Sequence, residues 1–332
     1  MKVSKKYLFI FLTIFLITFV SAGLFQKEKI CGDGTIEGEC SMHQPYFCSE
    51  QILVEKASIC GCSNLTELEG DFCLSPYQIN PKEIKLKYIL RGEEEEINYV
   101  VYEGLANYLF NLSDFIIYSN GQEPSRIDFK LRNINEENQK ILLIPLVVKI
   151  QNLADKKRDQ ARIAMSLVQN IPFGGSDELI LLGEDSTNYS RYPYEVLYDQ
   201  EGICASKSEL MVFFLREIGY ETVFFYHKEE NHDSVGIRCP KRYGLLNTSY
   251  CFVETTGPSI ITDYENTYLE DIKLNTYPEV MNVSEGSSLG YMHEYRDANR
   301  LKKMRKGIEE KGKINLLRDF KLKKIMKRYG IE

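Results

Sequence analysis

Residues 202–219, GICASKSELMVFFLREIG, have the pattern of an amphipathic helix that begins at a cysteine. Apolar side chains recur at helical spacing from Leu210 to Ile218, and Gly219 is a typical helix stop. Backbone N–H groups and the helix dipole at such an N-terminus stabilise a thiolate. Because the thiolate is the competent nucleophile, we interpret Cys204 as a candidate catalytic residue that needs a base and an orienting acid nearby.

Three strand-like runs follow this helix, and two of them carry the candidate partners. The runs cover residues 222–227, 232–239 and 250–256. His232 opens the second run and Glu254 lies in the third, and the alternation of side chains along strands lets both face one side of a sheet. His227, at the end of the first run, is the rival base. We therefore predict a site composed of Cys204, His232 and Glu254.

Two cysteines in these runs leave the strand register open. If Cys239 paired directly across the strands with Cys251, His232 would lie opposite Pro258, four residues beyond Glu254. Either Pro240 ends the strand and Cys239 turns back with the loop, or the two cysteines are not bonded.

From about residue 153 to residue 258 the chain resembles the transglutaminase-like superfamily of cysteine acyl-transfer enzymes and peptidases, and its exported prokaryotic and archaeal members most closely. The matching motifs occur in the expected order. They are Ile171-Pro-Phe, Arg191-Tyr-Pro-Tyr-Glu-Val-Leu, Gly202-Ile-Cys204, Glu217-Ile-Gly-Tyr, His232-Asp-Ser-Val-Gly-Ile and Val253-Glu-Thr-Thr-Gly-Pro.

This resemblance implies an α+β fold with a papain-like core, in which the helix that carries the cysteine packs on an antiparallel sheet. It implies that Cys204 is the nucleophile, His232 the general base and Glu254 the acid that orients the base. Many members have acidic residues just after the cysteine, whereas this chain has Ala205-Ser-Lys. The acid is also Glu rather than the commoner Asp.

The expected function is thiol-dependent acyl transfer on a protein or peptide substrate. The thiolate attacks an amide carbonyl, and the thioester releases its acyl group to water, as in a peptidase or amidase, or to an amine, as in a transglutaminase. This chemistry needs no cofactor and no metal. The alternative is a non-catalytic module on the cell surface that holds a peptide or protein in the same cleft. Labelling of Cys204 at neutral pH would favour the enzyme.

Residues 1–25 have the composition of a secretory signal, with Lys2, Lys5 and Lys6 before an uncharged run from Tyr7 to Phe25. The run is also long enough to remain as a membrane anchor. Both interpretations place the rest of the chain outside the cell, either secreted or anchored at the cell surface. Five Asn-x-Ser/Thr sequons are compatible with export.

Residues 26–76 contain six of the nine cysteines and read as a small module held by three disulfides. Six cysteines allow 15 pairings, among which the sequence does not choose. The alternative is a zinc site, which the C-x-C spacing of Cys60 and Cys62 disfavours. If Cys239 and Cys251 form a fourth bridge, Cys204 is the cysteine left over. The six cysteines are Cys31, Cys40, Cys48, Cys60, Cys62 and Cys73.

The remaining ranges complete the predicted organisation: a β-rich segment over 77–150, with strand-like runs at 84–90, 97–102 and 141–148, the transglutaminase-like domain over 151–290 and a basic helical tail over 291–332. From Arg296 onward the chain has 14 Lys and Arg against 5 Asp and Glu, a net charge of +9, and the rest carries −16. The acidic body argues against nucleic acid as a partner. The tail is either a solvated surface helix that packs on the domain or a contact for anionic lipid. With 43% hydrophobic residues, the chain can bury a core.

Overall fold

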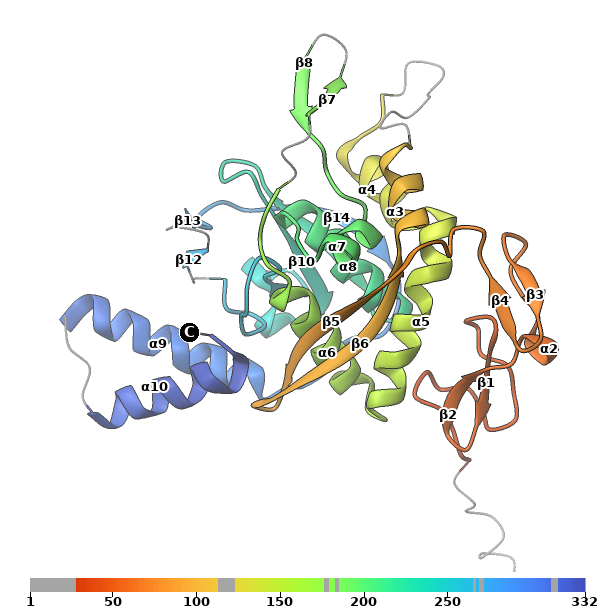
Figure 1. Cartoon of the computed structure of the whole chain (residues 1–332). Helices are drawn as coiled ribbons and strands as arrows, with labels where there is room; N and C mark the ends of the chain where they lie inside the picture. The colour runs from red at the N-terminus through yellow and green to blue at the C-terminus, as the bar shows by residue number, and fades with distance from the viewer. Residues whose placement is uncertain are drawn as a thin grey trace, which may run out of the picture.

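The computed structural model describes residues 28–112, 123–175, 179–182, 185–264, 267–268, 272–311 and 316–331. These residues form an α+β fold with a disulfide-rich module at one end, a body of helices and strands, and a C-terminal helical hairpin at the other end (Figure 1). No helix within these ranges is long and apolar enough to cross a membrane. The predicted signal or anchor at residues 1–25 lies outside the described residues.

The N-terminal module confirms the prediction of three disulfides. The bridges are Cys31–Cys48, Cys40–Cys60 and Cys62–Cys73, so these thiols are not available as zinc ligands. The regular elements of the module are short: β1 (Tyr46–Ser49), β2 (Ile52–Glu55), α2 (Ala57–Cys60), β3 (Glu67–Glu69) and β4 (Phe72–Leu74).

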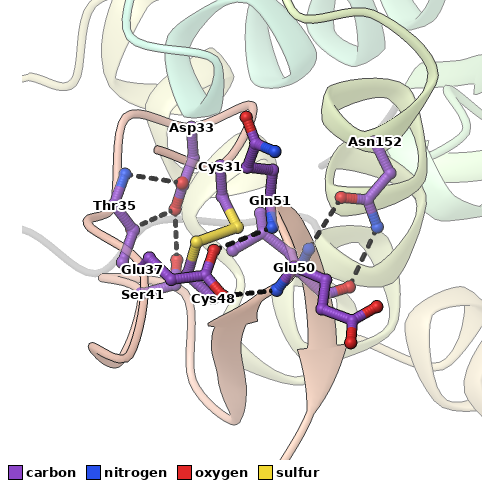
Figure 2. The surroundings of a disulfide bond; sticks show 10 residues. Cys31, Asp33, Thr35, Glu37, Ser41, Cys48, Glu50, Gln51 and Asn152 are labelled. Carbon is purple, nitrogen blue, oxygen red and sulfur yellow. Dashed lines mark hydrogen bonds between the residues drawn. A yellow bond between two sulfur atoms is a disulfide. The ribbon is translucent and has the colours of Figure 1, made fainter. Parts of the chain in front are cut away.

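The module is packed against the body of the protein. Cys31 and Cys48 are buried within the same hydrophobic core as the main helices. Figure 2 shows Asn152, from helix α5 (Glu137–Leu153), beside this bridge. The Asn152 side chain accepts a hydrogen bond from the backbone N–H of Leu53 and donates one to the Leu53 carbonyl, both at 2.9 Å. The bridge therefore lies at the junction between module and body.

The segment predicted to be β-rich is so only in its first third. β5 (Pro81–Leu90) and β6 (Glu93–Tyr102) form a long antiparallel hairpin, as the alternating pattern indicates. The remainder is helical, with α3 (Glu103–Phe110), α4 (Arg126–Asn135) and α5.

The expectation of a strand over residues 141–148 is wrong, because this run lies in the middle of α5. Glu136 caps the helix by accepting hydrogen bonds from the backbone N–H groups of Asn138 and Gln139. Pro145 lies inside the helix, and the apolar side chains around it are buried in the core. A short apolar run has the same appearance in a buried strand and in a helix buried on most sides, so periodicity alone misleads here.

A four-stranded antiparallel sheet forms the centre of the body, in the order β11-β10-β9-β14, and α8 (Cys204–Glu217) packs against it. The sequence predicted three of these strands, and β14 was not foreseen. The strands are β9 (Thr222–His227), β10 (His232–Arg238), β11 (Tyr250–Val253) and β14 (Glu279–Ser284). The other elements are α6 (Lys157–Asn170), β7 (Leu179–Leu182), β8 (Asp185–Asn188), α7 (Pro193–Asp199), two 3₁₀ turns (Lys241–Tyr243, Leu245–Asn247), β12 (Thr267–Tyr268) and β13 (Ile272–Lys273).

The register of β10 and β11 resolves the question of the two cysteines. Ile237 pairs with Cys251, and β10 ends at Arg238 before Pro240. Cys239 therefore lies beyond the strand, where it forms a disulfide with Cys251. The first of the two alternatives is confirmed, and the bridge leaves the register free to bring His232 towards Glu254.

Gly236→Ala is expected to destabilise this sheet by about 1–3 kcal/mol, because an added methyl group has no room. A Cβ atom there would lie 2.5 Å from Val223 Cγ2 and 2.7 Å from Phe225 Cζ, and both side chains are buried. Urea denaturation followed by circular dichroism measures the loss. Gly257→Ala is the control, since nothing lies within 4 Å of its added Cβ. Equal unfolding midpoints for the two variants would contradict the packing argument.

The basic tail forms two helices, α9 (Glu294–Lys311) and α10 (Leu316–Tyr329), which make the hairpin in Figure 1. Asp297 accepts hydrogen bonds from Arg328 at 2.7 Å and from the Tyr329 hydroxyl at 3.1 Å. Ala298, Leu301 and Ile325 form a small apolar cluster with Ile260 of the body. The tail is thus helical and packs on the domain, and contact with anionic lipid stays a prediction.

Candidate functional site

Cys204 is the first residue of α8 and is half-buried. All nine cysteines lie within the described residues, and Cys204 is the free one, as predicted. Gly202 aligns the segment before it with the end of α6. Its N–H donates to the Pro172 carbonyl at 3.2 Å, and its carbonyl accepts from the N–H of Gly174 at 3.3 Å. These bonds fix the turn from which α8 begins.

Arg191 also stabilises this turn through hydrogen bonds. Its guanidinium donates to Asp199 at 2.5 Å, to Glu201 at 3.2 Å and to the Gly174 carbonyl at 3.4 Å. The motif that begins at Arg191 therefore has a structural role: it joins α7 and the turn at Gly174 to the residues that precede Cys204.

His232 and Glu254 form a buried pair next to this helix. His232 Nε2 lies 3.0 Å from Glu254 Oε2, and the two side chains are 2% and 1% exposed. The other carboxylate oxygen accepts hydrogen bonds from the backbone N–H groups of Thr255 and Thr256 and from the Thr256 hydroxyl. Burial raises the pKa of Glu254, but its bonds with His232 and Thr256 outweigh that effect and hold the pKa below its usual value.

Cys204 completes this arrangement as the second partner of the imidazole. Burial lowers the pKa of His232, but hydrogen bonds with Cys204 and Glu254 and the charges of both groups raise it to about 10. Because Nε2 faces Glu254, Nδ1 is the ring nitrogen left for the thiol. The structure thus brings together the three side chains that the sequence singled out.

His227, the rival base, lies directly opposite His232 in the pairing of β9 with β10. Its Nδ1 is 3.2 Å from the Thr276 carbonyl, which fixes the proton on that nitrogen. Burial, and then the charge of His232, lower the pKa of His227. A neutral His227 therefore sits beside a charged His232, and the hydrogen bond with Cys204 belongs to His232.

Sequence reasoning missed a run of buried polar residues in the first turns of α8, just after Cys204. Lys207, Ser208 and Glu209 are 0%, 0% and 3% exposed. Lys207 Nζ donates to the Ile171 carbonyl at 2.5 Å and to the Thr256 carbonyl at 3.2 Å. Burial lowers the pKa of this lysine to about 8, against the opposing effect of the Glu254 charge. The sequence does contain a signal for this run. Three consecutive residues of a helix point in different directions, so three polar residues in succession within an amphipathic helix cannot all lie on its solvated face.

A second buried cluster joins α8 to β10, the strand that begins at His232. Lys130 Nζ of α4 lies 3.5 Å from Glu209 Oε1 and 3.2 Å from Asp233 Oδ1, next to His232 in the chain. Asn133 donates to Glu209 at 3.1 Å. Burial raises the pKa of Glu209 to about 7, although Lys130 and Asn133 oppose this shift. The cluster ties α4, α8 and β10 together behind the candidate site.

A cavity of about 710 Å³ opens between the disulfide module and α5, and it is not part of this site. It lies at the far end of α8, where His43 Nε2 is 3.3 Å from Glu217 Oε2. The 14 residues of α8 separate it from Cys204 by roughly 20 Å.

In comparisons with family models, curated proteins and solved structures, the chain has no significant match.

Proposed function

We propose that this protein is a thiol-dependent acyl-transfer enzyme with a transglutaminase-like core, which acts on protein or peptide amides outside the cell. The observation that carries the proposal is the buried His232–Glu254 pair, 3.0 Å apart, with Cys204 as the other partner of the imidazole. A nucleophile, a base and an orienting acid in this chain of hydrogen bonds constitute the usual machinery of acyl transfer.

The proposed reaction uses these groups in turn. The Cys204 thiolate attacks the amide carbonyl carbon, and the carbonyl π electrons move to oxygen. Backbone N–H groups in the first turn of α8 have no acceptor within the helix and can stabilise that oxyanion. As the oxyanion re-forms the carbonyl, the C–N bond breaks, the His232 imidazolium gives its proton to the leaving amine, and a thioester remains on Cys204. Water or an amine then attacks the thioester while neutral His232 takes up its proton. The C–S bond breaks, the acyl group leaves as an acid or a new amide, and the Cys204 thiolate and His232 imidazolium are restored.

The cysteine inventory supports action in an oxidising compartment. Four disulfides form, and disulfides persist in oxidising, extracellular environments. A single free thiol in such an environment is a liability unless it has a use, and Cys204 is the one placed beside a histidine. Secretion and retention by an N-terminal anchor are both compatible with this proposal.

The function is tested by incubating the purified protein with peptide mixtures, with and without a labelled primary amine. Acyl transfer predicts cleaved peptides, or amine-linked ones, and a thioester or thiol-probe adduct that mass spectrometry locates on Cys204. Peptides that are retained but unaltered, with a Cys204 that thiol probes do not modify, would instead support the non-catalytic binding module.

A titration of the histidines by nuclear magnetic resonance tests the electrostatics independently of any substrate. We expect the His232 imidazolium to persist above pH 8, since its pKa is raised to about 10. We expect His227 to titrate below the ordinary value of 6.5, since burial and the charge of His232 lower its pKa. The charge on His232 stabilises the fold fully below pH 6.5, and this contribution is lost as the pH rises towards 10. Glu254→Gln should lower the pKa of His232. A His232 that titrates at or below 6.5 in the wild type would contradict the arrangement.

A further inference from the structure

Two consecutive residues of α8 contact the segment that follows Glu254. Lys207 contacts the carbonyl of Thr256, two residues after Glu254. Ser208 Oγ lies 3.2 Å from Thr255 Oγ1, one residue after Glu254. Through these two contacts, the helix that begins at Cys204 is hydrogen-bonded to the segment that carries Glu254.

Lys207 also joins this segment to a third element. Its ammonium group donates to the carbonyl of Ile171, at the end of α6, in addition to that of Thr256. Ile171 precedes the Pro172 turn that pairs with Gly202 just before the nucleophile. One buried side chain therefore holds together the turn before Cys204, the helix that carries Cys204 and the segment that follows Glu254.

This arrangement needs a reason, because burying an ammonium group is costly. A lysine taken out of water must be compensated by hydrogen bonds and opposite charge. Here two backbone carbonyls accept from it, and the charge of Glu254 acts on it. An apolar side chain of similar length would fill the same space, so packing alone does not account for a lysine at this position.

We propose that Lys207, assisted by Ser208, is a positioning residue: it holds the segment that bears Glu254 against the nucleophile helix, so that Glu254 keeps His232 in place beside Cys204. The inference rests on the proposed acyl-transfer function. Glu254 accepts hydrogen bonds from the backbone N–H groups of Thr255 and Thr256. Lys207 and Ser208 of α8 contact these same two residues, so they fix the backbone on which the position of the acid depends.

The test uses Lys207→Met in the full chain, with the titration of His232 as the first readout. Loss of a nearby cation would by itself favour the imidazolium and raise the pKa of His232. Loss of positioning would weaken the hydrogen bond between Glu254 and His232 and lower the pKa of His232. The direction of the change in this pKa therefore separates the two effects. We expect a fall of about one pH unit or more. The groups that face His232 are Cys204, Glu254 and His227.

Peptide turnover is the second readout. Because a displaced acid impairs proton transfer more than substrate binding, kcat should fall about ten- to a hundredfold while KM changes little. Ser208→Ala and Thr255→Val remove the second contact with minimal change of shape. Each variant should lower both the pKa of His232 and kcat, by less than Lys207→Met does. Because both substitutions remove the same contact, the double variant should have the same pKa and kcat as either single variant. If Lys207→Met does not fold, these two variants decide the question.

Arg162→Met is the matched control, since it removes a cation that pairs with Asp159 and Glu294 away from Cys204. It should lower stability but leave the titration of His232 and kcat unchanged. If Lys207→Met, Ser208→Ala and Thr255→Val behave like this control, positioning is wrong and acyl transfer still stands. If the wild type turns over no peptide and His232 titrates as an ordinary histidine, the proposed function itself fails.

Discussion

Cys204→Ala is expected to abolish peptide acyl transfer, with a loss of roughly 10⁴-fold or more in kcat, because no other free thiol exists in the chain to form the thioester. His232→Ala should be nearly as severe, since the imidazole both holds the thiolate and protonates the leaving group. Glu254→Gln keeps the shape of the acid and should be about 100-fold milder. The glutamate orients the imidazole and stabilises its charge, and it does not itself exchange a proton with the substrate.

Steady-state turnover of the best peptide substrate measures this series. Cys204→Ser provides the structural control, because it retains the size of the side chain while its hydroxyl is a far weaker nucleophile. Thermal unfolding should confirm that the serine variant folds like the wild type. Equal activity of His232→Ala and the wild type would remove the assigned base and with it the proposed mechanism.

Replacing Cys31 and Cys48 together by alanine should lower the free energy of unfolding by about 2–5 kcal/mol. The bridge closes a loop of 17 residues, and its removal also leaves space in a packed core, because the two cysteines are 3% and 0% exposed. Since this core continues into α5 and the other main helices, the loss should extend to the body and not stay within the module.

The Cys62–Cys73 bridge is the natural comparison. It closes a shorter loop of 11 residues, and both cysteines are half-buried at the edge of the module. Its removal should cost less and leave the unfolding of the body unchanged in urea denaturation followed by far-ultraviolet circular dichroism. A cost equal to or greater than that of the Cys31–Cys48 pair would mean that the module and the body unfold independently.

The parts of the fold that could be predicted from sequence are those encoded by local pattern. The helix from Cys204 to Gly219 and the strands that carry His232 and lead to Glu254 have clear periodicity and clear stops, and they occur as predicted. Parity correctly indicated that His232 and Glu254 could meet, although Glu254 lies just beyond the end of β11. The catalytic roles of these residues stay predictions.

The elements that were missed depend on contacts distant in sequence. β14 completes the sheet by pairing with β9, more than 50 residues earlier in the chain, and its short, half-exposed pattern gives little signal. Helix α5 contains a proline and an apolar run that fit a strand equally well. Capping by Glu136 and burial of the apolar side chains on several sides favour the helix over a strand. The burial of these side chains cannot be inferred from the sequence before the fold is known.

The polar run at Lys207, Ser208 and Glu209 was missed for a related reason. Charged residues on a helix usually lie on its solvated face, so a lysine and a glutamate in succession read as surface. In the structure each is paired inside the protein, Lys207 with backbone carbonyls and Glu209 with Lys130. These partners come from α6, α4 and the segment after β11, and no local pattern identifies them.

The spacing of the bridges bears on how the chain acquires its oxidation state. The bonded cysteines are separated by 17, 20, 11 and 12 residues, so each pair closes a short loop, and short loops close readily. The three bridges of the module use only cysteines that precede Cys204. During vectorial entry into an oxidising compartment, the N-terminal cysteines can therefore be consumed before the free thiol emerges, and the last pair, Cys239 and Cys251, follows as a near neighbour. If the chain enters such a compartment from its N-terminus, the order of entry limits disulfide exchange between the module and Cys204.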